Sequence, residues 1–284
     1  MEPISPADQV TFKCPIVVVF DMDRTLVGIT NPLICFWLAS SCVFSPTVYM
    51  LLNMKDVIIS ALRERLARPF IKEFMERLKS EFTDTSVEFF VYTASKKDWA
   101  LVLIAYMEEA FGITFNRPVF NREEHTYKGL KLLDPIVPEI QSSLIQRYGY
   151  IPNKTIKKNM IVFDDNPDMY DEEHDIVHIF KCPSYSDTAF PDPRDIFPRD
   201  LLEKRYRDLA DFMTNTLSIP FNRCSMTNYK NFDDCCTEIM IVINHNMDHY
   251  TEDDESKYYW RDFDLTQIRD KLREIQYSSS FTLR

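Results

Sequence analysis

Residues 16–20 (IVVVF) are five consecutive apolar residues of high β-propensity, and Asp21 and Asp23 follow them directly. An apolar run without alternation predicts a strand that is buried on both faces, as in a parallel sheet covered by helices. In open sheets of this kind, ligands bind beyond the carboxyl ends of the strands. We therefore expect the two aspartates to lie at a site, because a solvated acidic cluster needs no apolar strand before it.

The rest of the first two-thirds of the chain alternates between short apolar runs and helical patterns, which predicts βαβ units and an α/β fold. Further strands are predicted at 87–95, 159–167 and 176–183. Helices are predicted at 55–80 with a break at Pro69, at 97–112, at 138–149 and near 199–217. The predicted architecture is a Rossmann-like parallel sheet flanked by helices.

These patterns divide the chain into a domain at 1–218 and a C-terminal extension at 219–284, to which the sequence assigns no role. A helical insertion or cap, residues 29–66, follows the first strand. Within the extension we expect a strand at 236–244, an acidic loop at 248–256 and a terminal helix at 262–276. The acidic loop is expected to be solvated, with contact to a basic partner as the alternative.

Composition narrows the functional classes. The chain has 284 residues, of which 45% are hydrophobic, so it can bury a full-sized core. Its net charge of −11 argues against direct nucleic-acid binding, which normally needs a basic surface. Only four glycines occur, with no glycine-rich phosphate loop, which argues strongly against a P-loop kinase or a dinucleotide-binding enzyme. Seven cysteines, an odd number, fit a reducing intracellular compartment, the cytoplasm or the nucleus.

No charged residue occurs between Thr25 and Met54, and residues 31–53 are largely apolar. A membrane-spanning helix needs about 20 predominantly apolar residues. Three serines and Pro46 interrupt this segment and leave two pieces of about ten residues each, so a membrane span is disfavoured. We expect a helical hairpin that is buried in the core or caps the site. A surface that docks a partner or dimerises is the alternative.

Polar residues follow three of the predicted strands, at the end where a parallel sheet binds ligands. Carboxylates that converge on one point repel each other, and a hard divalent cation with oxygen ligands, such as Mg²⁺, relieves that repulsion. A sheet with polar strand ends and no chemistry is disfavoured, because buried acids without a ligand are costly. The residues are Asp21, Asp23 and Thr25 after the first strand, Thr93 and Ser95 after the second, and Asp164 and Asp165 after the third.

A carboxylate beside Mg²⁺ can also act as a nucleophile and form an aspartyl-phosphate. Such a reaction needs a second acid to protonate the leaving group and a hydroxyl for the phosphate oxygens. It also needs a lysine that neutralises the transferring phosphoryl group. The strand ends and the segments between them offer all of these groups, so the sequence predicts phosphoryl-transfer chemistry.

At these residues the sequence resembles a known group of enzymes. Asp21-Met-Asp23-Arg-Thr25 resembles the DxDxT signature of the haloacid dehalogenase (HAD) superfamily, and VYTAS and VFDDNP resemble its second and fourth motifs, in the right order. RPFIKEFMERL, FFVYTAS and IVFDDNPDMY are similar to the FCP/SCP branch, phosphatases of phosphoserine in the C-terminal domain (CTD) of RNA polymerase II. The resemblance spans residues 16 to about 183 and implies a HAD-type fold and a Ser/Thr phosphoprotein phosphatase.

The resemblance also implies a role for each matching residue. Asp21 would be the nucleophile and Asp23 the general acid and base. Mg²⁺ would be bound by Asp21, by the backbone carbonyl of Asp23, and by Asp165. The phosphate ligands would be Thr93, Arg122 and Lys128, with Lys131 as the alternative to Lys128. Asp164 and Thr25 would be supporting residues.

The sequence departs from the family pattern in three places. Arg24 stands where an acidic residue is common, which alters the charge at the mouth of the site. The segment between Lys128 and Asp164 is longer than usual, and the last hundred residues have no counterpart in the small members. Two alternatives stay open: a scaffold that binds phosphoprotein without turnover, and a phosphatase of small metabolites or nucleic-acid 3′-phosphates. The YTAS and DDNP motifs favour a protein substrate.

Some large DNA viruses of insects encode phosphatases of this branch with a similar length. The asparagine-, aspartate- and tyrosine-rich, glycine-poor sequence also resembles one that acts in baculovirus nucleocapsid assembly. That resemblance implies a viral protein associated with the virion. Its substrate would be a small, basic, phosphorylated DNA-packaging protein, which an acidic enzyme attracts electrostatically.

Overall fold

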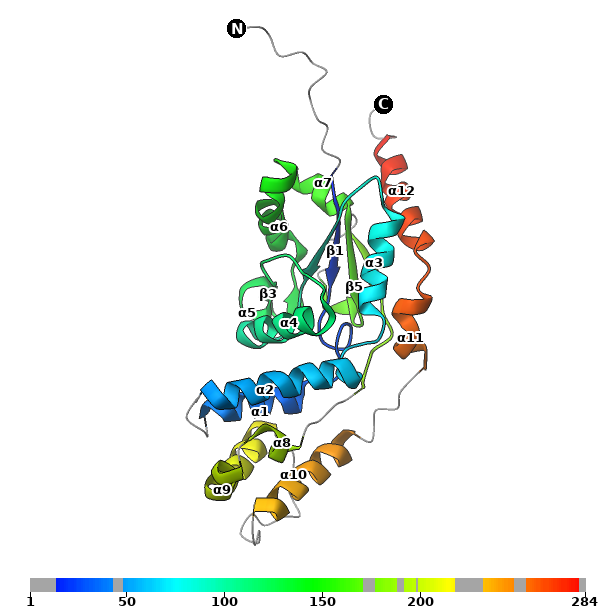
Figure 1. Cartoon of the computed structure of the whole chain (residues 1–284). Coiled ribbons are helices and arrows are strands. Elements are labelled where there is room, and N and C mark those ends of the chain that lie inside the picture. The colour runs from blue at the N-terminus through cyan, green and yellow to red at the C-terminus, as the bar shows by residue number, and fades with distance from the viewer. Residues whose placement is uncertain are drawn as a thin grey trace.

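The computed structural model describes residues 14–42, 48–170, 177–187, 192–197, 199–217, 232–247 and 254–280. A four-stranded parallel sheet in the order β2-β1-β5-β6 lies at its centre (Figure 1). The strands are β1 (Ile16–Phe20), β2 (Val87–Val91), β5 (Met160–Asp164) and β6 (His178–Lys181). The predicted α/β fold is confirmed and all four predicted strands are present, although the last three are shorter than the segments that predict them.

Both faces of β1 are buried, which explains its unbroken apolar sequence. Ile16, Val18 and Phe20 belong to one core cluster, and Val17 and Val19 belong to the other. Because side chains alternate along a strand, every residue of β1 enters one apolar layer or the other. The first cluster includes α3 (Ile71–Glu81), α4 (Lys97–Phe111) and α11 (Asp254–Asp262), and the second includes α6 (Leu133–Tyr148) and α7 (Asn153–Lys158).

The order of the strands places a topological switch point at the carboxyl end of β1. β2 pairs with one edge of β1 and β5 pairs with the other, so the chain continues on opposite sides of this strand. Phe20 at the end of β1 lies opposite Val91 of β2 and Phe163 of β5. Residues that follow these three strand ends therefore meet at one edge of the sheet, which is where open α/β sheets bind ligands.

Two helix boundaries show how packing and local signals combine. α4 ends, as predicted, at Gly112, which adopts a left-handed conformation with a φ of 64°. The expected start of α6 near Pro138 is wrong, because the helix begins at Leu133 and continues through the proline. Leu133, Ile136 and Val137 are buried in the core. Their packing stabilises the first turns, and Pro138 removes only one backbone N–H from the helix.

A small hairpin that the sequence does not predict lies between α4 and α6. α5 (Arg122–His125) leads into two antiparallel strands, β3 (Thr126–Tyr127) and β4 (Leu130–Lys131). Lys128 and Gly129 form the turn between them, with φ values of 50° and 85°. Strands of two residues leave no alternation in the sequence, so periodicity could not have found them.

Among the described residues, five helices lie beyond the carboxyl ends of the strands, and we call them the helical body (Figure 1). α1 and α2 form the predicted helical hairpin from the uncharged segment, and Leu33, Phe36 and Ala39 of α1 are buried in the core. No helix in the described ranges is long and apolar enough to cross a membrane. The five helices are α1 (Asn31–Cys42), α2 (Val48–Ala61, followed by a π-helical turn at Leu62–Leu66), α8 (Pro193–Ile196), α9 (Arg199–Leu217) and α10 (Phe232–Met247).

The expectation of a strand at 236–244 is wrong, because this apolar run is part of helix α10. Cys235, Cys236 and Ile239 are buried in the core, whereas Ile241 is 53% exposed. Burial at this spacing places one face of a helix against the core. A short apolar run fits a buried strand and a buried helix equally well, and here the packing partners decide between them.

The end of the chain forms two helices where the sequence predicts one. The helix expected at 262–276 is α12 (Thr266–Ser280), and α11 precedes it. α11 begins inside the acidic run expected to be a loop, of which residues 248–253 lie outside the described residues. Trp260 of α11 is buried in the same cluster as Phe20 of β1, so the described end of the extension packs on the sheet. The division of the chain at residue 218 stays a prediction.

Candidate active site

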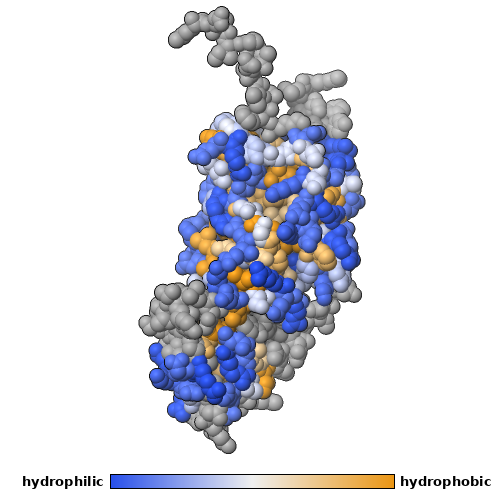
Figure 2. Space-filling view, viewed as in Figure 1, coloured by the Kyte–Doolittle hydropathy of each residue, from blue (hydrophilic) through white to orange (hydrophobic). Residues whose placement is uncertain are grey.

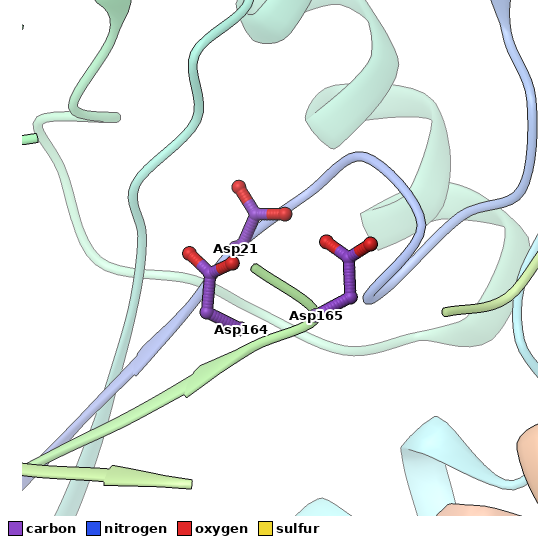
Figure 3. A group of neighbouring side chains, drawn as sticks. All are labelled: Asp21, Asp164 and Asp165. Carbon is purple, nitrogen blue, oxygen red and sulfur yellow. The ribbon is translucent and has the colours of Figure 1, made fainter. Parts of the chain in front are cut away.

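Three aspartates converge at the carboxyl end of the sheet (Figure 3). Asp21 follows β1, Asp164 is the last residue of β5, and Asp165 follows it. Each offers a carboxylate oxygen within 4.8 Å of those of the other two. Asp21 and Asp164 are buried, and Asp165 is half-buried. The N–H of Asp21 donates to the carbonyl of Phe163 at 2.8 Å, so the β-ladder itself holds Asp21 beside β5.

A buried lysine lies between two of these carboxylates. Lys131 Nζ donates to Asp21 Oδ1 and to Asp164 Oδ2, each at 2.6 Å, and its side chain is 2% exposed. The rings of Tyr92 and Tyr170 lie near the ammonium, with centroids 5.6 Å and 5.3 Å away. Carboxylates and aromatic faces together stabilise a buried cation. The lysine reaches this position because it is the last residue of strand β4.

Lys128, which sequence spacing favours as the phosphate ligand, lies elsewhere. It is exposed at the hairpin turn, where its Nζ is 5.2 Å from the centroid of the Tyr127 ring. Lys131, the alternative, is the lysine that the structure brings to the aspartates. Its position between Leu130 and Leu132 is the signal that could have singled it out, because a lysine in an apolar run is buried only with charged partners.

The cluster carries more negative than positive charge. Burial raises the pKa of Asp21 well above its ordinary value, and together with the charges of Asp164 and Asp23 it outweighs the opposing effect of Lys131. Burial alone would lower the pKa of Lys131, but the charges of Asp21 and Asp164 raise it overall, so this lysine stays protonated at neutral pH. Burial also raises the pKa of Asp165. Three carboxyl groups around one ammonium therefore favour additional positive charge, as a proton or as a bound cation.

The donor set fits a hard divalent cation. Asp21, Asp164 and Asp165 supply carboxylate oxygens, which suit Mg²⁺ or Ca²⁺ better than Zn²⁺. A bound cation would favour the charged form of Asp21 and so oppose the rise in its pKa. The expected contact from the backbone carbonyl of Asp23 stays a prediction.

Asp23 is held by hydroxyl groups from two other segments. Thr93 Oγ1 and Ser95 Oγ donate to Asp23 Oδ2 at 2.9 Å and 2.8 Å, and Thr30 Oγ1 donates to Oδ1 at 3.5 Å. The N–H of Ser95 in turn donates to Thr93 Oγ1 at 2.9 Å. The hydroxyl of Thr93, expected to bind phosphate, thus lies on the carboxylate of Asp23. Ser95 and Thr30 join it there, although the sequence assigns them no specific role.

Hydrogen bonds to the backbone tie the loop after β1 to the loop after β5. Thr25 Oγ1 accepts from the N–H of Asp165 at 2.9 Å, which joins the two loops, and within the second loop Asp164 Oδ1 accepts from the N–H of Asn166 at 2.8 Å. Thr25 is fully buried. Thr25 and Asp164 therefore lie at the centre of the cluster, where they fix the aspartates relative to one another.

Two arginines from the sequence analysis lie at the rim of the cluster. Arg24 is exposed and has a φ of 61°, and its carbonyl accepts from Arg68 Nη2 at 2.7 Å and from the N–H of Tyr185 at 2.8 Å. Arg122 is also exposed, and its N–H donates to the carbonyl of Ser95 at 3.1 Å. α5 is thereby attached to the loop that follows β2. A phosphate contact from Arg122 stays a prediction.

The parallel sheet, the DxDxT sequence at the end of its first strand, and a lysine and two aspartates gathered beside it define a HAD-type phosphatase. A family model described as NLI interacting factor-like phosphatase matches residues 16–204, which is more than half of the chain. The chain therefore belongs to the NLI interacting factor-like phosphatases, an FCP-like group of HAD phosphatases. The expectation of an FCP-like HAD phosphatase is confirmed.

Solved structures of an RNA polymerase II CTD phosphatase are among those that resemble this chain. One is Fcp1, described as an essential RNA polymerase II CTD phosphatase, with 14% sequence identity and a TM-score of 0.39. Another is an arginine-to-alanine variant of the fission yeast RNA polymerase II CTD phosphatase Fcp1 bound to beryllium fluoride, with 14% identity and a TM-score of 0.40. Each match covers 93% of this chain and 63% of the solved chain. A search of curated protein sequences gave no match.

Proposed function

We propose that this chain is a Mg²⁺-dependent protein Ser/Thr phosphatase that forms an aspartyl-phosphate on Asp21. The observation that carries the proposal is the contact of Lys131 with both Asp21 and Asp164 at the end of β1. A carboxylate that is fixed beside a cation can attack a phosphate ester, and the same cation then stabilises the phosphorylated product. Membership of a phosphatase family supports this chemistry.

Asp21 attacks the phosphorus atom of the substrate with one carboxylate oxygen, and the bond from phosphorus to the serine or threonine oxygen breaks on the opposite side. Asp23 gives a proton to the departing oxygen. Asp23, now a carboxylate, then takes a proton from the water molecule that attacks the same phosphorus. Inorganic phosphate leaves, and the Asp21 carboxylate is restored.

Neighbouring side chains hold these two aspartates for the reaction. Thr93 and Ser95 bind one oxygen of Asp23 and thereby orient its carboxyl group. Lys131 offsets the charge of Asp21 before the attack and that of the phosphoryl oxygens after it. Mg²⁺, when bound by the aspartates, supplies further positive charge for the transferring phosphoryl group.

The proposed substrate is phosphoserine or phosphothreonine in a protein, which a CTD phosphatase-like family supports. Within this class, a basic DNA-packaging protein of a virus would suit an enzyme whose net charge is −11, because opposite charges raise the rate at which enzyme and substrate meet. Hydrophilic residues cover most of the described surface that Figure 2 shows. The enzyme would act in a reducing compartment of the cell, or in association with the virion.

The test is hydrolysis of p-nitrophenyl phosphate and of a phosphoserine peptide by the full chain. We expect Asp21→Asn to remain folded and to lose activity by roughly 10⁴-fold or more, because it removes the nucleophile. Asp84→Asn, at an exposed aspartate between α3 and β2, should keep full activity. EDTA should remove activity, Mg²⁺ should restore it, and beryllofluoride should inhibit. Unchanged activity of Asp21→Asn would contradict the aspartyl-phosphate.

A second experiment separates the alternative substrates. Asp23→Asn cannot protonate the leaving group, so immobilised Asp23→Asn should retain phosphoproteins that the wild type releases. Enrichment of a phosphoprotein supports a protein substrate. If no phosphoprotein is enriched, small-molecule or nucleic-acid phosphates become the favoured substrates. A chain that shows no hydrolysis and no response to EDTA or beryllofluoride would be a non-catalytic scaffold.

A further inference from the structure

α11 is the part of the C-terminal extension that lies behind the candidate active site. It packs beside α3 on one face of the sheet (Figure 1). Trp260 of α11 is fully buried, and its ring centroid lies 5.6 Å from that of Phe20 and 5.3 Å from that of Phe163. Phe20 immediately precedes Asp21, and Phe163 immediately precedes Asp164. The ring of Trp260 therefore supports the last core residues of both strands that carry the aspartates.

This contact belongs to a dense aromatic cluster. Phe20 and Phe163 stack on each other with centroids 5.6 Å apart, and Phe74 of α3 lies 4.6 Å from Trp260. Interiors packed in this way have few voids, so a smaller ring at one position lets its neighbours shift. A loss of ring volume at Trp260 would therefore be felt at the two strand ends.

A second contact runs from α11 to the loop after β1 through Arg68. This guanidinium is fully buried, and its Nη2 donates to the carbonyls of Arg24 at 2.7 Å and Pro183 at 2.5 Å. Its Cζ lies 5.6 Å from the ring centroids of both Tyr259 and Trp260. Its Nε and Nη1 have no hydrogen-bond partner within the described residues. The aromatic faces around it, two of them from α11, therefore help to stabilise the rest of the buried charge.

Arg24 is the position at which this support reaches the site. It lies between Asp23 and Thr25, and its φ of 61° is a left-handed conformation that residues other than glycine rarely adopt. Such a conformation persists only where the surroundings hold it. Arg68 supplies part of that restraint by binding the carbonyl of Arg24, which also accepts from the N–H of Tyr185.

α11 is itself fixed at its C-terminal end. Arg77 of α3 donates to the carbonyls of Trp260 at 3.2 Å, Arg261 at 2.7 Å and Phe263 at 3.1 Å. A cationic side chain here binds carbonyls that the end of a helix leaves without partners. Hydrogen bonds as well as packing thus attach α11 to α3. A helix that supports the strand ends must itself be held in place in this way.

We propose that α11 is a positioning element of the active site. Trp260 holds the ends of β1 and β5, and Tyr259 and Trp260 together hold Arg68 against the loop that carries Asp23. None of these side chains touches substrate, because they act through the strands and the loop. The kinetic consequence rests on the proposed phosphatase function, whereas the coupling of α11 to the loop does not.

Trp260→Phe tests the first contact, with Trp99→Phe as its matched control. Both indoles are buried in the same core cluster, and neither indole N–H has a hydrogen-bond partner in the part of the chain that the structure describes. Both substitutions therefore remove ring volume and no hydrogen bond. The ring of Trp99, in α4, lies against Trp37 of α1. Arg68→Lys tests the second contact, since lysine keeps the charge without the planar guanidinium that lies near the Tyr259 and Trp260 rings.

Two readouts are taken on the full chain. The first is kcat and KM for p-nitrophenyl phosphate, measured well below the melting temperature of each variant. The second is the rate of amide hydrogen exchange in the peptide that covers residues 21–28. We expect Trp260→Phe and Arg68→Lys to lower kcat about tenfold with KM within about twofold, because small displacements of reacting groups cost rate. Both should also speed exchange in that peptide, and Trp99→Phe should change neither readout. A merely structural role would lower melting temperatures without moving kcat or this exchange.

Equal behaviour of Trp260→Phe and Trp99→Phe in both readouts overturns the proposal. If the wild type hydrolyses no phosphate ester, the phosphatase function fails and hydrogen exchange alone decides the coupling. Faster exchange in Trp260→Phe and Arg68→Lys, but not in Trp99→Phe, then supports the role of α11 as a support for the loop. Equal exchange in all three variants rejects it.

Discussion

The candidate site and the helical body are built by different interactions. In the site, charged and hydroxyl groups are joined by individual hydrogen bonds: Lys131 binds two aspartates, and Thr93 and Ser95 bind another. In the helical body the buried core contacts are apolar, as between Phe36 of α1 and Phe197, whose ring centroids are 6.3 Å apart, and ion pairs such as Arg194–Asp233 join more exposed side chains. Hydrogen bonds depend on direction, whereas apolar burial does not. Small chemical changes should therefore reduce activity in the site and stability in the body.

The largest expected effect separates two lysines of one hairpin. Lys131→Met should lower kcat/KM by about 10³-fold, because it removes the cation between Asp21 and Asp164. Lys128→Met should stay within about threefold, since Lys128 is exposed at the turn. Steady-state kinetics with p-nitrophenyl phosphate measures both. A larger loss of kcat/KM in Lys128→Met than in Lys131→Met would restore Lys128 as the phosphate ligand, as sequence spacing predicts.

The same lysine gives an expectation for pH. Burial acts to lower the pKa of Lys131, but the charges of Asp21 and Asp164 outweigh it and raise the pKa above its ordinary value. The ammonium should therefore persist as pH rises through about 10.4, where an ordinary lysine loses its proton. A pH profile of kcat/KM, recorded where the enzyme stays folded, should show no loss from this group up to that pH. A fall in the kcat/KM of the wild type that is centred below pH 9, and that Lys131→Met does not show, would contradict the raised pKa of Lys131.

The next effect lies in the helical body and concerns stability. Leu33 of α1 is fully buried, so Leu33→Ala should lower the free energy of unfolding by about 2–5 kcal/mol. Its kcat, measured well below the melting temperature, should stay within about twofold of wild type. Urea denaturation and steady-state kinetics measure the two quantities. A tenfold fall in kcat would show that the α1–α2 hairpin acts as a cap on the site, and would remove the contrast between the regions.

A smaller effect is expected for one hydroxyl of the site. Ser95→Ala removes one of the hydrogen bonds to Asp23 and leaves that of Thr93, so we expect kcat to fall about tenfold. Ser142 also makes one hydrogen bond, at 2.9 Å to the carbonyl of Pro138, but lies on α6 away from the aspartates. Ser142→Ala should therefore keep kcat within about twofold. Equal kcat values for the two variants would mean that Ser95 does not orient Asp23.

The smallest difference between the two regions is expected for their thiols. Burial raises the pKa of Cys182, which lies beside β5, and of Cys235 and Cys236, in α10, to about 12. At pH 8 only about 10⁻⁴ of such a thiol is the reactive thiolate, so all three should react with iodoacetamide about 10³-fold more slowly than an exposed thiol. The rates, followed by peptide mass spectrometry, should rise with pH. Much faster labelling of Cys235 or Cys236 than of Cys182 would show that the helical body opens more readily than the sheet.

The aspartates of the site could be predicted from the sequence because their surroundings are local. Asp21, Asp164 and Asp165 each follow an unbroken apolar run, so the strand ends could be placed without tertiary information. Lys131 follows no such run, and its two leucine neighbours are a much weaker local signal that distinguishes it from Lys128. Its strand is two residues long, and its partners lie 33 and 110 residues away in the sequence.

Tertiary packing also explains what the sequence did not show in the last third of the chain. The apolar run 236–244 fits a strand and a helix equally well, and the neighbours of α10 settle which one forms. The contacts of Trp260 with Phe20 and with Arg68 join residues far apart in the sequence and leave no periodic signal. The role of the extension could therefore not be inferred from its own residues.

The burial of Trp260 against Phe20 has a consequence for the biosynthesis of the enzyme. All the motif residues, from Asp21 to Asp165, leave the ribosome before α11 has been made. At about 5–20 residues per second, α11 follows them by roughly 5–20 s. During that interval the apolar rings at the ends of β1 and β5 lack their cover, which makes the nascent chain a target for chaperones. Catalytic competence should therefore begin only when the last helices have been synthesised.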